Sequence, residues 1–247
     1  MSAPIRVLVW NENFHETMQQ HVKELYPEGI HGAVAAGIRE NLGDAVVVET
    51  AVLTDPEHGL TEERLAQTDV LLWWGHAKHD DVSDEVVARV HRHVLAGMGL
   101  IVLHSGHFSK PFISLMGTTC SLQWRSVGER ELVWTVAPNH PITRGVPSPL
   151  PLAAHEMYGE FFDVPTPDEL IFISSFEGGE AFRSGMTFRR GRGRIFYFSP
   201  GDQEYPIYHD ASIRRVIANA VGWAAGDARD PRAVPEVRHA TVKAWDV

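Results

Sequence analysis

Two histidines and a serine directly follow a short apolar run near the middle of the chain. Leu100 to Leu103 has the pattern of a buried strand, and it stops at His104, Ser105 and His107, where a helix is expected to begin. In open α/β sheets, ligands bind where strands release their C-terminal ends into loops. Imidazoles and a hydroxyl at such a place can serve acid–base, nucleophilic or metal-binding chemistry. The segment Gly99 to Lys110 is therefore the first candidate site.

Two earlier apolar runs also end in loops that carry polar side chains. Ile5 to Trp10 is followed by Asn11 and Glu12, and Asp69 to Trp74 is followed by a loop that contains His76. Because the carboxyl ends of parallel strands meet at one edge of a sheet, we expect these loops to share a crevice. The histidines and glutamates expected to reach it are His15, His76, His79, His104, His107, Glu156 and Glu160.

Acyl transfer is one chemistry that this arrangement suggests, with Ser105 as the nucleophile on the strand-to-helix turn. The surrounding letters are Leu-His-Ser-Gly-His, however, and they differ from the G-x-S-x-G nucleophile elbow. A serine also needs a base that a third group orients, and His107 and Glu156 are the candidates for those two roles. Cys120 lies away from any strand end, so a cysteine nucleophile is less favoured still.

Metal chemistry is a second possibility. Catalytic zinc favours two or three imidazoles with a carboxylate, and it keeps one position open. The chain has no compact signature such as H-E-x-x-H, so its ligands must come from separate loops. We expect His76, His107 and His15 to bind the ion, which would be zinc or manganese. We expect no nucleotide cofactor, since neither G-x-x-x-x-G-K-[ST] nor a G-x-G-x-x-G after the first strand is present.

Metal-free proton transfer on a sugar or polyol is a third possibility. Carboxylates paired with histidines can act as acid and base, and aromatic rings can stack on pyranose rings. The carboxylates are Glu12, Glu156, Glu160 and Asp202, and the aromatic candidates are Trp73, Trp74 and Tyr158.

Strand-like and helix-like segments alternate through the first half of the chain. Strands are expected over 5–10, 45–53, 69–74 and 100–103, with helices over 29–42, 61–66 and after Ser83. This alternation predicts an α/β fold with a doubly wound, mostly parallel sheet between two helix layers, in the strand order 2-1-3-4. In that order the histidine-bearing loops lie at the crevice where the order reverses.

The second half of the chain has a different pattern. Strands are expected over 124–136 and 169–176, separated by a proline-rich stretch over 138–167. A hairpin over 181–197 and a helix over 213–224 follow, which adds an antiparallel extension to the sheet. We expect a single domain over 1–247, with residues 226–247 as a C-terminal arm.

Composition excludes several classes of function. The formal net charge of −10 argues against a nucleic acid or an anionic membrane as partner. No apolar run is long enough to span a bilayer, and the N-terminus does not resemble a signal peptide. The single cysteine excludes an internal disulfide framework and fits a reducing compartment. We therefore expect a cytoplasmic protein with a small-molecule ligand, and we expect it to be a homo-oligomer.

Several short motifs resemble those of the ThuA-like, or trehalose-utilization, family, and they extend from about residue 5 to residue 224. They are Trp10-Asn11-Glu12, His15-Glu16, Trp73 to His76 with His79 and Val82, Leu103 to Lys110, Glu156 to Glu160, Phe176 to Glu180, and Arg189 to Gly193.

The resemblance implies a flavodoxin-like fold of the class I glutamine amidotransferase-like type. Relatives in that superfamily place a cysteine where this chain has Ser105, so amidotransferase chemistry is not expected here. The family is associated with catabolism of trehalose and related disaccharides, through 3-keto derivatives made by a partner dehydrogenase. Relatives often have Pro-Gly-His after the last strand, whereas this chain has Asp202 in place of the histidine. If that histidine is catalytic or metal-binding in relatives, the resemblance implies that Asp202 substitutes for it or that the activity here is altered.

Together these patterns predict a carbohydrate-catabolism enzyme that acts on a disaccharide or its 3-keto derivative by acid–base chemistry, with or without a metal. A non-catalytic sugar-binding or assembly subunit on the same scaffold is the alternative. The residues expected to carry catalysis are His107, Glu156 and Asp202. Those expected to bind substrate are Asn11, Glu12, His104, Ser105, Tyr158 and Glu160.

Overall fold

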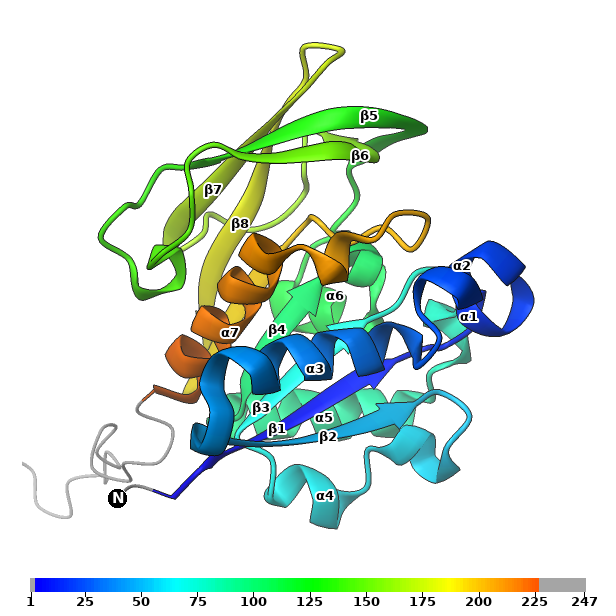
Figure 1. The fold of residues 1–247 in the computed structure, drawn as a ribbon. Coiled ribbons are helices and arrows are strands. Elements are labelled where there is room, and N and C mark those ends of the chain that lie inside the picture. Colours follow the sequence, from blue (N-terminus) through cyan, green and yellow to red (C-terminus); the bar gives the residue numbers. More distant parts are fainter. Residues whose placement is uncertain (1–2, 227–247) are drawn as a thin grey trace, which may run out of the picture.

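The computed structural model describes residues 3–226, which form a mixed α/β fold on one nine-stranded sheet (Figure 1). The strand order is β2-β1-β3-β4-β9-β8-β7-β5-β6, so the predicted order 2-1-3-4 is confirmed. The parallel strands are β1 (Ile5–Asn11), β2 (Val46–Val52), β3 (Val70–Trp74), β4 (Gly99–Leu103) and β9 (Gly193–Phe198). An antiparallel extension was predicted, and it comprises β5 (Gln123–Thr135), β7 (Glu169–Phe176), β8 (Ala181–Arg190) and one strand that was not predicted, β6 (Leu150–Gly159).

Helices cover both faces of the parallel half of the sheet (Figure 1). On one face, α3 (Gly29–Leu42) and α7 (Ala211–Ala225) lie side by side. On the other lie α4 (Glu62–Ala66), α5 (Asp84–Ala96) and α6 (Lys110–Met116). Two short helices that the sequence did not predict, α1 (His15–Met18) and α2 (Gln20–Leu25), follow β1.

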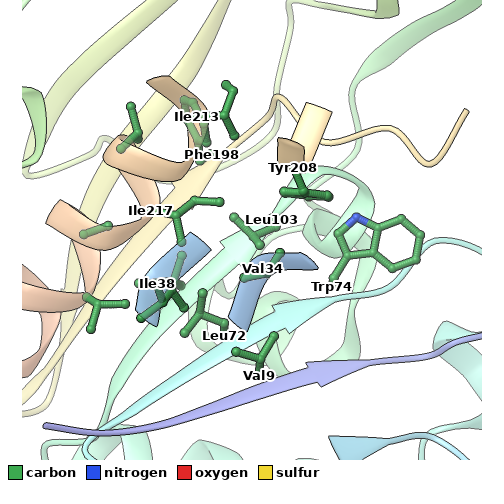
Figure 2. Packing of buried hydrophobic residues seen from close by; sticks show 14 of the residues in the cluster. Val9, Val34, Ile38, Leu72, Trp74, Leu103, Phe198, Tyr208, Ile213 and Ile217 are labelled. Atoms are coloured by element: carbon green, nitrogen blue, oxygen red, sulfur yellow. The ribbon is translucent and has the colours of Figure 1, made fainter. Parts of the chain in front are cut away.

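The core explains why the parallel strands are continuous apolar runs. Successive residues of a strand point to opposite faces, and here each face meets helices. Val9 thus packs in the α3–α7 core, while its neighbour Trp10 packs in the core under α5. Figure 2 shows the first of these cores, where Ile38 of α3 and Ile217 of α7 meet the sheet. Truncating either isoleucine to alanine would cost about 2–5 kcal/mol of unfolding free energy.

Local signals set the helix ends as expected. Ser83 caps α5 by accepting a hydrogen bond from the Val86 N–H, and Thr61 caps α4 in the same way. Gly43 ends α3, with a positive φ of 51° that favours glycine. Ser109 caps α6, which follows the 3₁₀ turn His104–Phe108. These caps fix where the loops at the sheet edge begin and end.

One strand contradicts the sequence analysis. The proline-rich stretch over 138–167 was expected only to separate two strands, but it contains β6, which pairs with β5 at the edge of the sheet. Pro151 lies inside β6, and prolines interrupt the pattern by which strands are recognised in sequence. An edge strand tolerates them because one side of its backbone needs no partner. This strand matters for function because it carries Glu156 and Tyr158.

Two further sequence expectations concern the chain ends and membranes. The C-terminal arm expected over 226–247 lies, apart from Gly226, outside the described residues. Within residues 3–226, no helix is long and apolar enough to cross a membrane.

Candidate functional site

The ends of the central strands converge at one edge of the sheet. Asn11, at the end of β1, lies in register with Trp74 of β3, and Trp74 in turn with Leu103 of β4. The residues that follow these strands therefore emerge side by side, and the loop after β9 joins them. His76, His104 and Asp202 come from three of these loops, as the strand order predicted.

His104 occupies the sharp turn at the end of β4. Its φ of +49° lies in the left-handed region, which is uncommon for residues other than glycine. The strained position of the turn is thus His104, and Ser105 is the next residue along. The Oγ of Ser105 lies 2.7 Å from the Tyr158 hydroxyl, with which it shares a hydrogen bond. From this strained turn the fully buried imidazole of His104 reaches the loop after β9.

Two carboxylates meet the ring of His104. Its Nδ1–H donates to the Ser199 carbonyl at 2.8 Å, so the tautomer is set by a group that can only accept. Nε2 lies 3.2 Å from the Glu156 carboxylate, 3.5 Å from that of Asp202 and 3.3 Å from the Tyr158 hydroxyl. Glu156 comes from β6 and Asp202 from the loop after β9, so this contact joins the two halves of the sheet.

The charges of these three side chains depend on one another. Burial alone would lower the pKa of His104, but the hydrogen bonds and charges of Asp202 and Glu156 outweigh it and raise the pKa to about 9. For Asp202, burial opposes ionisation, but the His104 contact overcomes it and lowers the pKa to about 2. In this geometry an imidazolium at His104 and the ionised carboxylate of Asp202 stabilise each other at neutral pH.

A buried histidine holds the Asp202 loop in place. Nε2 of His155 accepts hydrogen bonds from the N–H groups of Gly201 and Asp202, at 2.9 and 3.2 Å. Its Nδ1 lies 2.7 Å from the carboxylate of Glu131, which is fully buried. His155 thus orients the backbone from which Asp202 projects. His155 was not among the residues selected from the sequence.

A second loop is held by Glu12. Its carboxylate accepts the backbone N–H groups of His76, Ala77 and Lys78, at 2.7 to 3.1 Å. Nδ1 of His76 lies 3.2 Å from Nε2 of His15. Burial, together with the neighbouring His104 and His15, lowers the pKa of His76 to about 4, so this imidazole is neutral at pH 7. Glu12 therefore positions the His76 loop, and its oxygens are already occupied by backbone donors.

A cavity of about 210 Å³ lies over this cluster. His107 is one of its walls, and its Nδ1–H donates to the Cys120 carbonyl at 2.7 Å. Burial lowers the pKa of His107 to about 3, which keeps its ring neutral. Trp124 of β5 also lines the cavity and leaves 63% of its side chain exposed. The lining residues are His76, Ser105, His107, Phe108, Trp124, Glu156 and Tyr158.

The predicted site residues thus divide into those at the cavity and those behind it. Glu160 binds Arg183 through two hydrogen bonds of 2.8 and 2.9 Å and does not line the cavity. Asn11 is fully buried and bonds to Glu16. The predicted residues that line the cavity or meet at its base are His76, His104, Ser105, His107, Glu156, Tyr158 and Asp202.

Trp73 and Trp74, which were candidates for stacking on a sugar, lie in the core instead. Both residues are buried, with only 1% of their surface exposed. Trp73 stacks on Trp10 with ring centroids 3.9 Å apart, and the Trp74 indole N–H donates to the Gly201 carbonyl. The exposed aromatic residues that line the cavity are Trp124 and Phe108, and neither was selected from the sequence as a stacking residue. A tryptophan within an expected strand carries no signal of which face it occupies.

Comparison with known proteins agrees with this architecture. A ThuA-like protein from Bacteroides uniformis superposes with a TM-score of 0.66 at 14% identity, covering 91% of this chain and 93% of that one. A ThuA-like protein from Parabacteroides merdae gives 0.64 at 15% identity, with 90% of each chain covered. A cytoplasmic protein of Salmonella typhimurium gives 0.55 at 9% identity, covering 89% and 99%. These likenesses concern the fold.

The family assignment rests on the sequence. No curated protein matches the chain. The model of the ThuA family, described as trehalose utilisation, matches residues 6–224. This range includes the whole sheet except Ile5, the first residue of β1, and it includes every loop of the site. The chain belongs to the ThuA family.

Proposed function

We propose that this protein is an enzyme of carbohydrate catabolism that acts by acid–base chemistry on a disaccharide or its 3-keto derivative. Membership of a family described as trehalose utilisation supports the substrate class. The observation that carries the proposal is the convergence of Glu156 and Asp202 on Nε2 of His104, directly beneath a cavity. Paired, buried titratable groups of this kind are typical of catalytic sites.

Glu156 is the residue we assign as general base. It lines the cavity, whereas His104 and Asp202 lie at its base, outside the lining residues. A ketone at C3 of a sugar acidifies the hydrogen on the neighbouring carbon. Glu156 would take that proton from C2, and the electron pair would move onto the ketone oxygen to give an enolate. Collapse of the enolate would then form the C1–C2 double bond and break the C1–O bond, and the departing sugar oxygen would take the proton back from Glu156. Nε2 of His104 lies 3.2 Å from the Glu156 carboxylate and holds it in place at the base of the cavity.

Two hydroxyls are placed to stabilise the enolate. Ser105 and Tyr158 share a hydrogen bond of 2.7 Å, and both line the cavity. Hydroxyl donors aimed at a developing oxyanion act most strongly in a site that excludes water. His107, neutral and donating its Nδ1–H to Cys120, is left with Nε2 as an acceptor for a sugar hydroxyl. His107 thus suits the role of a hydrogen-bond acceptor for substrate, and its lowered pKa makes it a poor member of an acid–base pair.

We extend the proposal to a flavodoxin-like fold class and a cytoplasmic location. The strand order supports a flavodoxin-like classification, and the single buried cysteine suits a cytoplasmic enzyme.

Turnover of trehalose and of 3-keto-trehalose by the purified protein tests the proposal. We expect release of product from the keto substrate, and E156Q should lower kcat by a factor of about 10²–10⁴ while leaving the fold intact. E177Q is the matched control, because Glu177 is an exposed glutamate on the turn between β7 and β8, where it pairs with Arg130 of β5. Full activity in E156Q would overturn the assignment of the base. Binding of the sugar by wild type without any turnover would instead indicate a non-catalytic binding subunit.

A further inference from the structure

We propose that His76, His104, Glu156 and Asp202 bind one divalent transition-metal ion at the base of the cavity. Each of these side chains offers one ligand atom, and the four atoms all lie within 4.8 Å of one another. The set differs from the ligands predicted from sequence, because it keeps His76 and replaces His107 and His15. The inference deepens the proposed function and rests on it through Glu156: one carboxylate oxygen of Glu156 would bind the ion, which leaves the other oxygen to act as the base.

The distances around His104 fit a metal centre. Ligand distances of about 2.0–2.2 Å place the donors of a tetrahedral site about 3.3–3.6 Å apart. Nε2 of His104 lies 3.2 Å from the Glu156 oxygen and 3.5 Å from the Asp202 oxygen. His76 is the least buried of the four and lines the open cavity, so it is the ligand that can move inward to close the set.

Three of the four ligands are held by a partner behind them. The Nδ1–H of His104 donates to the Ser199 carbonyl, which leaves the Nε2 lone pair for an ion once that nitrogen is deprotonated. Nδ1 of His76 is engaged by His15, and Glu12 fixes the backbone of its loop. His155 orients the Asp202 backbone in turn. Carbonyl and carboxylate partners of this kind are typical of histidines and loops that bind metals.

Charge and ligand chemistry indicate the kind of ion. Two carboxylates meet two imidazoles here, and none of the residues that line the cavity is a lysine or arginine. A divalent cation would balance both carboxylates in the absence of such a side chain. Two imidazoles with two carboxylates suit zinc or manganese, whereas magnesium and calcium prefer a shell made of oxygen atoms.

Titration of the untagged full-length protein, stripped with EDTA, tests this site by calorimetry and by metal analysis after dialysis. We expect one zinc or manganese ion per chain, and at least tenfold weaker binding of magnesium. D202N and E156Q keep the side-chain shape, and each should weaken zinc binding by a factor of about 30 or more. H107N removes a histidine that lines the cavity outside the set, and it should bind zinc within a factor of about three of wild type.

The surface histidines need a separate control. His93 pairs with Glu62 on the protein surface, and H93N reports zinc bound adventitiously at such places. Failure to bind either zinc or manganese would overturn the site, as would equal affinities for wild type, D202N and E156Q. A protein that binds zinc as described but turns over no sugar would overturn only the proposed function. Turnover that survives EDTA, with no metal bound, would overturn only the metal site.

Discussion

Nε2 of His104 lies 3.5 Å from the carboxylate of Asp202, and both side chains are at least 99% buried. A buried charge pair that loses one partner leaves an uncompensated charge, which is strongly destabilising. The pair also joins the turn after β4 to the loop after β9, so its state affects the packing of both. Protonation at this one contact should therefore be measurable as a change in global stability.

The metal-free protein should be most stable near pH 6.5. The pKa of His104 is raised from 6.5 to about 9 in the fold, so its stabilising contribution is complete below pH 6.5 and is lost as the pH rises through 9. The pKa values of His76 and His107 are lowered to about 4 and about 3, so their contribution is lost as the pH falls below 6.5. Urea unfolding between pH 4 and pH 10 in EDTA measures this profile, and the alkaline limb should amount to about 2–3 kcal/mol.

D202N is the variant that isolates the alkaline limb. Without the Asp202 charge the pKa of His104 is raised less, so stability should fall less between pH 6.5 and pH 9 than in wild type. The exposed aspartate Asp80 provides the matched control D80N, which should retain the wild-type slope. An alkaline limb of the same size in D202N would show that His104 and Asp202 are not coupled as described.

His155 should behave as a positioning residue for Asp202. Its Nε2 accepts the N–H groups of Gly201 and Asp202, so H155L should misplace the Asp202 carboxylate and lower kcat by a factor of about 10–100 with a smaller effect on KM. H155Q keeps an acceptor in the side chain and should restore part of the loss. Steady-state kinetics with the keto substrate, well below the melting temperature of each variant, provide the measurement. A purely structural role would lower the melting temperature and leave kcat at the assay temperature unchanged.

Gly201 should tolerate no side chain, because of one specific neighbour. A Cβ at this position would lie 2.0 Å from the Tyr208 hydroxyl and 3.1 Å from Cβ of His104. We expect G201A to cost about 1–3 kcal/mol of unfolding free energy, measured in urea. Y208F removes the hydroxyl, so the double variant G201A/Y208F should recover part of that loss. The recovery should be incomplete, since Cζ of Tyr208 is also close, at 2.8 Å. Strictly additive losses would contradict the close approach.

The parallel half of the fold was predictable because its signals are local. Continuous apolar runs mark strands that are buried on both faces, and the loops after them carried His76 and His104 to the site. Capping residues such as Ser83 and Thr61 were equally readable, since each cap involves only the next few residues. Right-handed crossovers then fixed the order of the strands.

The antiparallel half was less predictable because its pairings are distant in the sequence. β6 lies on the sheet edge and contains Pro151, so it lacks the usual pattern of a strand. Glu131 and His155 become partners only through the pairing of β5 with β6. The ligand set of the proposed metal site depends on this same long-range pairing, because it brings Glu156 to His104.

Trp124 should determine how well the protein binds the second ring of a disaccharide. It lines the cavity, yet 63% of its side chain is exposed, so its indole extends from the cavity toward solvent. Exposed indoles are costly to leave in water and provide a flat apolar face for a sugar ring. We expect W124A to weaken binding of a disaccharide by about 1–2 kcal/mol, or roughly 5–30-fold, and to change binding of the matching monosaccharide much less.

W134A is the matched control, since Trp134 is an exposed tryptophan on the same strand that is absent from the cavity lining. Calorimetric titration of both sugars into inactive E156Q provides the measurement without turnover. Equal losses for the two sugars would mean that Trp124 contacts the first ring, and no loss for either would remove it from the binding site.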